Sequence, residues 1–435
     1  MEQIERQADV IVVGGGLAGL ASAAYLAREG RRVLLFEKAD APGGRARTRT
    51  LDGFHFNLGP HALYLGGKAA AVLRELGVAF EGGEPQVSGG YAVRSGVLHT
   101  LPIGFVSLLT TGLLRPKEKI EAARLLAGLR RLDTRAIQGV TLAAWVRDHV
   151  ESPAVRDLMT AIVRVATYTH DPERLSAGAA LAQVRRAGAG VLYLHGGWQS
   201  LVDRLRAAAA AAGVRIVTHR PVAAVVRDPA VRGVRLEDDT VVATSTVLIA
   251  GSPQMAAELT STGTRTVVAD WALRAVPVHA ACLDVALERL PRPEAVFALG
   301  IDHPLYASVH SAVARLAPQG GALIQLARYG GLGGESAPAV EQQLRVLLDA
   351  LQPGWRERVV RQRFLPDLIV SNAVVMAAEG GTASRPGPGV PEVPGLHVAG
   401  DWVGPDGMLA DASLSSARRA AFAILATAAN RTAAA

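Results

Sequence analysis

The chain has 435 residues, 49% of them hydrophobic, and a mean hydropathy of +0.22. This length predicts two or three domains with large apolar cores, and the composition excludes a disordered chain. The formal charge is +7, but the basic residues are scattered and no aromatic residues are interleaved with them. We therefore expect a solvated basic surface, at most a weak preference for membranes, and no nucleic-acid partner.

Cysteine content and the first residues limit the location of the protein. Cys282 is the only cysteine, which excludes an internal disulfide and a thiolate metal cluster, and we expect no metal site. Residues 1–7 are charged and lead directly into a predicted strand, so no signal peptide is expected. No apolar run approaches the ~20 residues of a membrane-spanning helix. We expect a cytoplasmic protein that can associate peripherally with a membrane.

The chain opens with a predicted strand, a glycine turn, a helix and a second strand. Residues 9–13 form a β-branched run, residues 17–29 have a helical pattern that stops at Gly30, and residues 33–36 form a second apolar run. This unit predicts the start of a dinucleotide-binding fold, because the turn lies where a phosphate group can reach the helix N-terminus.

The three glycines of the turn have separate expected roles. Gly14 allows the tight turn, Gly16 allows a pyrophosphate to approach the backbone, and Gly19 allows the helix to pack closely on the sheet. Leu17 and Ala18 begin the helix, and we include both among the expected cofactor contacts because the unpaired N–H groups of a first helical turn attract negative charge.

Charged residues follow the second strand. Glu37 is placed to accept hydrogen bonds from a ribose 2′-hydroxyl, and its charge disfavours the 2′-phosphate of NADP. We include the neighbouring Lys38 among the cofactor contacts. Gly44 and Arg45 come shortly afterwards, and the Arg45 guanidinium can bind the same pyrophosphate through charge-assisted hydrogen bonds.

Glu37 followed by Gly43-Gly44-Arg45 resembles the FAD signature of the superfamily of flavin amine oxidases, protoporphyrinogen oxidases and phytoene desaturases. Residues 395–402 resemble the closing strand of that superfamily. The resemblance is closest to phytoene-dehydrogenase-like oxidoreductases. It implies FAD as a non-covalent cofactor, because this chain lacks the C-terminal cysteine that tethers the flavin in some amine oxidases.

The resemblance also implies contacts with FAD. Gly400 and Asp401 would bind the ribityl or pyrophosphate region, and the strand that begins at Val222 would hold the adenine. The backbone near Met408 and Leu409 would meet the pyrimidine edge of the flavin, where a helix N-terminus stabilises the negative charge of the reduced ring.

The turn after the aromatic segment 53–58 is the expected neighbour of the isoalloxazine ring. In the superfamily the chain after Gly-Gly-Arg passes beside this ring, which here brings Gly59, Pro60 and His61 to the flavin. His61 is the one catalytic candidate, as a proton-transfer group. The alternative is a turn histidine that only bonds the backbone.

The predicted fold class is α/β: a Rossmann-like FAD-binding domain with an inserted α+β substrate domain of helices and an antiparallel sheet. We expect the FAD-binding domain to comprise residues 1–68, 191–262 and 381–435. We expect the substrate domain to comprise a helical part, residues 69–190, and a sheet part, residues 263–380.

The sheet part is expected to wall a cavity opposite the flavin. Its expected strands are residues 278–285, 305–312, 322–329 and 368–375, with a helix at 340–351. Four polar side chains on these strands are candidates for the inner wall: Tyr306, His310, Gln325 and Tyr329. Alternation alone does not decide which face they occupy, so we expect structural rather than catalytic roles for them.

Residues 97–114 form an apolar segment that is followed by Arg115, Lys117 and Lys119. Pro102 interrupts the segment, which is too short to span a bilayer. We expect a buried core helix. The alternative is a segment that dips into a membrane interface next to its flanking cations.

Two departures from the superfamily pattern bear on the reaction. The amine-oxidase branch places a lysine near the flavin, whereas no lysine follows Lys119 here. That branch also has an aromatic residue where this chain has Met408. Both differences favour a desaturase or dehydrogenase that transfers hydride to flavin N5 from an apolar, isoprenoid-like small molecule.

Two other reactions stay open. One is an amine or porphyrinogen oxidase that produces hydrogen peroxide, and the other is a redox-neutral flavin-dependent isomerase. The chain has no second glycine motif for NAD(P)H. A net oxidation therefore needs oxygen, a quinone or another electron acceptor.

Overall fold

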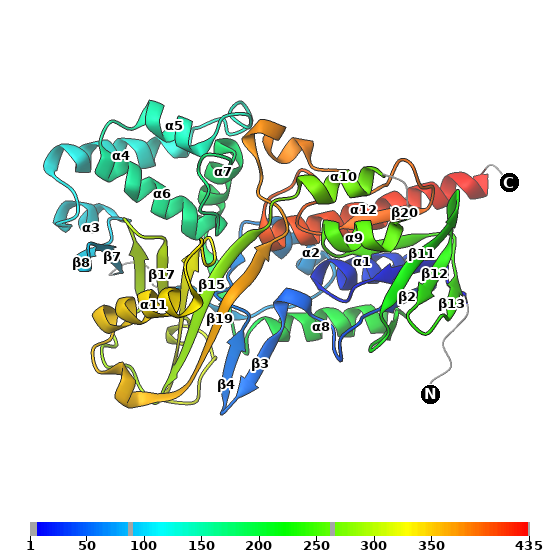
Figure 1. Ribbon diagram of the computed structural model, residues 1–435, viewed down its shortest axis with the longest axis horizontal. Helices are drawn as coiled ribbons and strands as arrows, with labels where there is room; N and C mark the ends of the chain where they lie inside the picture. Colours follow the sequence, from blue (N-terminus) through cyan, green and yellow to red (C-terminus); the bar gives the residue numbers. More distant parts are fainter. Residues whose placement is uncertain (1–6, 86–89, 262–265, 434–435) are drawn as a thin grey trace.

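The computed structural model describes residues 7–85, 90–261 and 266–433. The chain forms two lobes that are joined by long strands and by several chain crossings (Figure 1). The largest sheet of one lobe is parallel, the largest sheet of the other is mainly antiparallel, and helices pack on both. This arrangement confirms the predicted α/β fold class. The expected boundary between the FAD-binding domain and the sheet part of the substrate domain, between residues 262 and 263, lies outside the described residues.

A five-stranded parallel sheet organises the nucleotide lobe, in the order β10-β2-β1-β14-β20. Its strands are β1 Val10–Val13, β2 Val33–Phe36, β10 Arg215–Val217, β14 Val247–Ala250 and β20 Leu396–Ala399. Every residue of β1 and β2 is buried, because helices cover both faces of the sheet. The opening and closing segments of the chain therefore lie in one sheet.

Helices from distant parts of the sequence cover this sheet. One layer contains α1 Leu17–Arg28, α2 Lys68–Glu75, α8 Trp198–Ala211 and α12 Leu409–Ala433, and the other contains α9 Pro253–Thr260 and α10 Val267–Arg274. The alanine-rich faces of α1 and α12 pack closely, and Ser22 Oγ lies 3.3 Å from the carbonyl oxygen of Ala417. The two ends of the chain thus share one core (Figure 1).

Smaller sheets border the nucleotide lobe. An antiparallel sheet contains β11 Val222–Asp228, β12 Ala230–Leu236 and β13 Val241–Ala243, and a hairpin pairs β3 Thr48–Leu51 with β4 Phe54–Asn57. Short strands β5 Leu63–Tyr64 and β6 Gly82–Gly83 both pair with β9 Val191–Leu194. These pairings hold the segment after β4 against the segment that leads into α8.

A seven-stranded sheet dominates the substrate lobe, in the order β19-β15-β18-β17-β16-β7-β8. All neighbours are antiparallel except β16 and β7. The strands are β7 Tyr91–Arg94, β8 Val97–Thr100, β15 Val278–Leu287, β16 Phe297–Gly300, β17 Leu305–Val309, β18 Ala322–Tyr329 and β19 Val359–Ser371. The expected antiparallel sheet is therefore present, with β7 and β8 added from the stretch 69–190 that we expected to be helical.

Three of the four expected strands have different bounds, although the first, β15, only extends two residues further, to Leu287. β19 begins at Val359 and ends at Ser371, so it contains residues 368–371 of the predicted strand 368–375 but not residues 372–375, and residues 310–312 form a 3-10 helix after β17. β19 is an edge strand with many exposed positions. An exposed edge strand carries little apolar alternation, which explains why its first half gave no strand signal.

The two faces of the seven-stranded sheet have different neighbours. One face packs Leu283 and Leu326 against α11 Ala337–Leu351. The opposite face, which we call the inner face, carries Cys282, Tyr306 and Tyr329. It packs against the helical layer α4 Pro116–Leu129, α5 Leu142–His149, α6 Pro153–Thr167 and α7 Ala177–Ala187.

Residues 97–114 do not form the buried core helix that we expected. They form β8 and a short helix, α3 Phe105–Thr110, on which Phe105, Val106 and Leu109 are 77%, 71% and 57% exposed. α3 is only six residues long, and Leu108 is its one buried apolar side chain. Among the described residues, no helix is long and apolar enough to cross a bilayer.

Candidate functional site

The first glycine turn is built around backbone contacts. Gly14 has φ +104° and donates its N–H to the carbonyl oxygen of Phe36 at 2.8 Å. A Cβ atom at Gly19 would lie 1.9 Å from the Gly14 carbonyl oxygen, whereas a Cβ at Gly16 would meet nothing within 4 Å. Gly19 thus has no room for a side chain, and the space beside Gly16 is open, which is compatible with the ligand contact expected there.

The N-terminus of α1 has no side-chain cap at Gly16. Its first N–H groups therefore remain available to an anion, and the helix dipole favours negative charge there. Leu17 and Ala18 are nearly buried at this end of the helix, so they can contribute backbone groups rather than side chains to a bound pyrophosphate.

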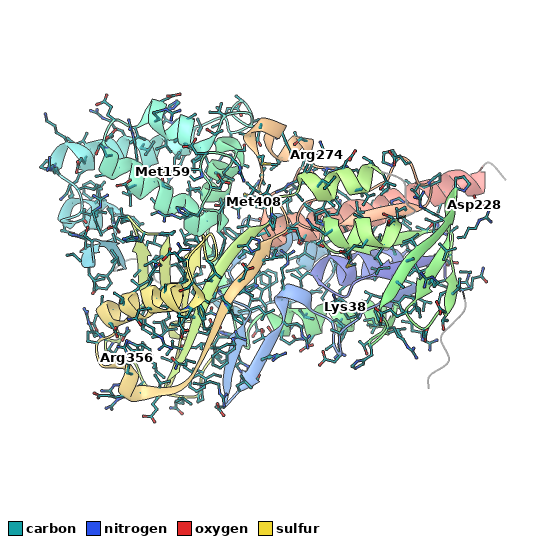
Figure 2. The ribbon with its side chains drawn as sticks, in the orientation of Figure 1. Lys38, Met159, Asp228, Arg274, Arg356 and Met408 are labelled. Carbon is teal, nitrogen blue, oxygen red and sulfur yellow. The ribbon has the colours of Figure 1, made fainter. Side chains whose placement is uncertain are left out.

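Glu37 is fixed beside the same turn. Its carboxylate is buried and accepts hydrogen bonds from the N–H of Gly15 at 2.7 Å and from the N–H of Ala39 at 2.9 Å. These bonds hold the acid at the end of β2, where a ribose would meet it. Lys38 is exposed and lies at the edge of the lobe (Figure 2).

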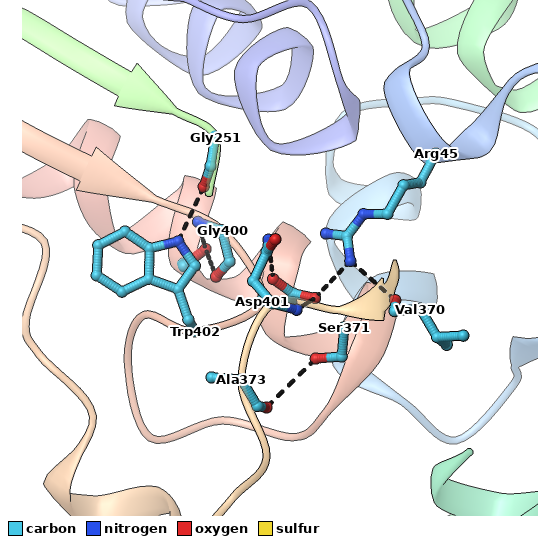
Figure 3. A network of polar contacts seen from close by, with 10 residues as sticks. Arg45, Gly251, Val370, Ser371, Ala373, Gly400, Asp401 and Trp402 are labelled. Atoms are coloured by element: carbon cyan, nitrogen blue, oxygen red, sulfur yellow. Dashed lines mark hydrogen bonds and ion pairs between the residues drawn. The ribbon is translucent and has the colours of Figure 1, made fainter. Parts of the chain in front are cut away.

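Arg45 and Asp401 join the two motifs that lie at opposite ends of the sequence (Figure 3). Arg45 Nη1 donates to Asp401 Oδ2 at 2.9 Å and to the carbonyl oxygen of Val370 at 2.8 Å. Asn372 donates its backbone N–H to Asp401 Oδ2 at 3.1 Å and its Nδ2 to Asp401 Oδ1 at 2.7 Å. Asp401 is 1% exposed, whereas Arg45 is 40% exposed, so part of the guanidinium remains open to a ligand.

Electrostatics keep Asp401 ionised. Burial acts to raise the pKa of Asp401, but the charge and hydrogen bond of Arg45, together with the bonds from Asn372, lower it below its usual value. The preceding Gly400 donates its N–H to Ser416 Oγ at 2.9 Å, which fixes β20 to α12.

The start of α12 reaches the inner face of the substrate lobe. Met408 is buried in one apolar cluster with Cys282, Tyr306 and Tyr329, and it lies where the two lobes meet (Figure 2). Leu409 has φ +56°, an unusual conformation for a residue other than glycine, which is typical of functional sites. The expected adenine contact, Val222, lies at the start of β11 in the nucleotide lobe.

The Gly59–His61 turn faces the inner face directly. The Gly59 carbonyl oxygen accepts from Gln325 Nε2 at 3.2 Å, and the Pro60 carbonyl oxygen accepts from the Tyr168 hydroxyl at 3.0 Å. A Cβ atom at Gly59, where φ is +77°, would meet Cys282 Sγ at 3.0 Å. The candidates Gln325, Tyr306 and Tyr329 therefore share the face that looks toward this turn.

His61 is held by its own turn. Its Nδ1 lies 2.9 Å from the Gly59 carbonyl oxygen, and its ring centroid lies 5.0 Å from that of Trp198. Burial lowers the pKa of His61, which favours the neutral ring. The backbone bond matches the structural alternative for this residue, and its role in proton transfer stays a prediction.

A buried network of hydroxyl groups adds residues that the sequence did not reveal. Tyr193 OH lies 3.2 Å from Tyr306 OH and 3.3 Å from Ser308 Oγ, and Tyr306 OH lies 3.1 Å from His310 Nε2. The rings of Tyr193 and His310 stack at 3.7 Å. Burial, and secondly the electrostatic interaction with His61, lower the pKa of His310 to about 3. Tyr193 comes from β9, so no pattern in β17 or β18 could have indicated it.

A buried ion pair lies on the same face. Arg363 Nη2 lies 2.5 Å from Asp284 Oδ2, and Asp284 is fully buried. Burial raises the pKa of Asp284 to about 6, although the Arg363 charge opposes the change. Asp284 inside the apolar run 278–287 is a sequence signal for this pair.

Three of the expected cofactor residues share one edge of the parallel sheet. Gly14 and Glu37 directly follow β1 and β2, Asp401 is the second residue after β20, and the C-terminal ends of parallel strands lie on the same side of a sheet. Open space at Gly16, an uncapped helix N-terminus and a partly free guanidinium fit a dinucleotide with a pyrophosphate.

Comparison with known proteins identifies the family. The family model of flavin containing amine oxidoreductases matches residues 17–425, and the protein belongs to this family. It is therefore a flavin-dependent oxidoreductase with FAD as its cofactor. The superfamily resemblance and the cofactor expected from the sequence are confirmed.

Individual relatives differ in what their names say. A carotenoid 3,4-desaturase of Haloarcula japonica is 54% identical over 52 residues, 12% of this chain and 10% of that protein. A Mycobacterium tuberculosis protein, named with the flavin-containing monoamine oxidases, is 33% identical over 192 residues, 41% of each chain. The chain thus spans well under half the length of these relatives.

Solved structures show the same fold. An oxidoreductase from Methanosarcina mazei matches with a TM-score of 0.76 over 96% of this chain and 99% of that chain, at 20% sequence identity. At this identity the similarity establishes the fold. The reaction and the substrate have to be argued from the site.

Proposed function

We propose that this protein is a desaturase or dehydrogenase that oxidises a lipophilic, isoprenoid-like substrate. Bound FAD supplies the hydride acceptor at flavin N5. The observation that carries the proposal is the surface facing the Gly59–His61 turn, where Met408, Tyr306 and Tyr329 belong to one buried apolar cluster. Such a wall favours a carbon skeleton over a charged amine.

The roles of the cofactor-binding residues follow from their positions. We assign the pyrophosphate to the backbone around Gly16 and to Arg45, and the ribose of the adenosine to Glu37. We assign the ribityl chain to Asp401 and the pyrimidine edge of the ring to the backbone at Met408 and Leu409. A helix N-terminus in that place stabilises negative charge on the reduced ring.

The inner face would position the substrate. Tyr306 and Tyr329 offer broad aromatic surfaces, and their rings lie 6.4 Å apart. The neutral His310 and its hydroxyl partners can accept a hydrogen bond without placing a full charge in the apolar wall. Close packing on this face would also keep water away from the reacting carbon.

An amine oxidase is the principal competing function, because one relative carries that name. No lysine follows Lys119 in the sequence, and Met408 occupies the place where the resemblance leads us to expect an aromatic residue. We therefore expect no amine turnover. Oxygen or a quinone would reoxidise the flavin after each cycle.

The test is aerobic incubation of the holoprotein with a panel of amines and a panel of linear isoprenoids. Peroxide release is measured for both panels, and products are analysed by mass spectrometry, with and without an added quinone. We expect isoprenoid products that are lighter by two hydrogen atoms. Peroxide release with amines alone would replace the proposal with an amine oxidase.

We also propose that α3 places the protein on an anionic membrane surface from which the substrate enters. Phe105, Val106 and Leu109 are the exposed apolar residues of this helix. Arg115 and Lys117 are exposed immediately beyond it, and no acidic residue occurs between Val97 and Lys117. Aromatic and aliphatic side chains beside cations suit the interface of a bilayer with anionic head groups.

A further inference from the structure

Arg164 is a buried cation without an ionic partner. It lies on α6 and is 4% exposed. Its Nη2 donates to the carbonyl oxygen of Ile301 at 3.3 Å, and its Nε has no hydrogen-bond partner within the described part of the chain. It forms no ion pair with any carboxylate among the residues that the structure describes. Burial lowers the pKa of Arg164, yet a guanidinium stays charged in proteins.

The nearest acids are already engaged elsewhere. Asp157 Oδ2 accepts from Arg94 Nη2 at 2.8 Å, and Asp302 Oδ2 accepts from the N–H of Ser95 at 2.7 Å. Both carboxylates act on Arg164 only through longer-range attraction. A buried charge is costly unless a hydrogen-bonded counter-charge compensates it. Arg164 lacks such a counter-charge among the described residues.

Tyr329, which lies near Arg164, also has a buried polar group to satisfy. This tyrosine is 2% exposed, its hydroxyl has no hydrogen-bond partner in the regions of the chain that the structure describes, and it interacts electrostatically with Arg164. A donor hydroxyl and a guanidinium with a free N–H therefore lie in one neighbourhood. Such a pair can bind both oxygens of a carboxylate.

A row of tyrosines connects this pair with the flavin turn. The ring of Tyr168 lies 5.9 Å from that of Tyr329, and the Tyr168 hydroxyl donates to the Pro60 carbonyl oxygen at 3.0 Å. A molecule that extends along these two rings would have one end at Arg164 and a carbon atom near the Gly59–His61 turn.

We propose that Arg164 and Tyr329 form a subsite for the carboxylate of an amphipathic substrate, a lipophilic acid whose chain runs along the tyrosines toward the flavin. This assignment deepens the proposed oxidation of a lipophilic substrate and rests on it. A single guanidinium matches the charge of a monoanion, whereas a phosphate dianion would need further cations. The same cation repels an ammonium group.

The test compares two ligands with one carbon chain. Decanoate, which is ionised at pH 7, and 1-decanol are titrated into the FAD-loaded protein by calorimetry. We expect decanoate to bind about tenfold more tightly or better, because a hydrogen bond to a charged group is stronger than one to a neutral group. Equal affinity, or no binding of decanoate, would overturn the subsite.

Substitutions test whether decanoate binds to Arg164 and Tyr329. Arg164→Gln should abolish the preference for decanoate and leave decanol affinity unchanged, Arg164→Lys should keep part of it, and Tyr329→Phe should weaken decanoate alone. Arg147→Gln, which removes an exposed arginine of the same helical layer, should change neither affinity. An unchanged preference in Arg164→Gln and Tyr329→Phe would contradict the proposal.

Thermal unfolding separates ligand binding from a purely structural role. If Arg164 serves a ligand, Arg164→Gln should not lower the unfolding temperature of the decanoate-free protein, because it removes an uncompensated buried charge. A large loss of stability would instead show that the arginine is a structural element. The calorimetry measures binding and not turnover. A decanoate preference that is absent would therefore overturn the subsite and leave the oxidation proposal standing. If no substrate is oxidised, the calorimetry still tests the subsite.

Discussion

Arg45 and Asp401 form an ion pair at 2.9 Å although 356 positions separate them in the sequence. Arg45 belongs to the opening glycine motif, and Asp401 follows the last strand of the parallel sheet. The pair therefore links the first and last segments of the nucleotide lobe, at the edge of the sheet where we expect the cofactor. Because the arginine is partly exposed and the aspartate is buried, a ligand can reach the guanidinium while the acid holds it in place.

Asp401→Asn is expected to weaken FAD binding. The change removes the charge that fixes Arg45 and the charged acceptor that we assign to the ribityl chain. Charged hydrogen bonds contribute about 1.5–3 kcal/mol each, so the Kd for FAD should rise about tenfold or more. Fluorescence titration of the apoprotein with FAD measures the change. Asp406→Asn, in the neighbouring loop, is the control and should leave the Kd unaltered.

Two alanine substitutions in one turn should have opposite effects. Gly16→Ala adds a methyl group where nothing lies within 4 Å, so the fold should persist while the pyrophosphate is excluded. Gly19→Ala places a methyl group 1.9 Å from the Gly14 carbonyl oxygen and should cost about 1–3 kcal/mol of stability. Thermal unfolding and FAD content distinguish them, and a yellow, normally stable Gly16→Ala protein would contradict the assignment.

The raised pKa of Asp284 predicts that its contribution to the free energy of unfolding depends on pH. Burial raises its pKa to about 6, whereas an unfolded aspartate titrates near 3.9. The folded protein holds this proton more tightly, so its contribution to the free energy of unfolding falls as the pH rises from about 4 to about 6. The difference in unfolding free energy between wild type and Asp284→Asn should decline over this window. A difference that is independent of pH would show that Asp284 titrates normally.

The α3 surface predicts binding to anionic vesicles. The double change Phe105→Ser and Leu109→Ser removes two exposed apolar side chains, each worth about 1.5–3 kcal/mol when buried. Sedimentation with phosphatidylglycerol-rich vesicles should capture the wild-type protein and lose the variant. Leu273→Ser is the matched control, because Leu273 is 74% exposed on α10. Wild-type protein that stays in the supernatant would remove α3 as a membrane contact.

Short-range patterns in the sequence were sufficient to predict the opening unit of the nucleotide lobe, whereas its closing strand was expected from the family resemblance. The strand, glycine turn, helix and acid around Glu37 form one local unit, and each part has a distinct residue type. The predicted strand 33–36 matches β2, and the predicted helix 17–29 matches α1 to within one residue. Glycine chemistry and periodicity act over few residues, which is why this part needs no tertiary information.

The inner face could not be predicted in the same way. Alternation placed Tyr306 and Tyr329 on strands but left the choice of face open, because that choice depends on α11 packing against the opposite side. Tyr193 and Arg164 come from β9 and α6, and only the fold brings them next to these strands. The exposed position of α3 was also missed, since its apolar composition resembles that of a core helix.

The central claim is that a lipophilic substrate gives hydride directly to the bound flavin. The most direct measurement is anaerobic mixing of the holoprotein with linear isoprenoids and isoprenoid acids while the flavin spectrum is recorded. We predict loss of the oxidised flavin bands with one equivalent of a product that has lost two hydrogen atoms. A spectrum that stays oxidised with every isoprenoid but is bleached by an amine would contradict the account.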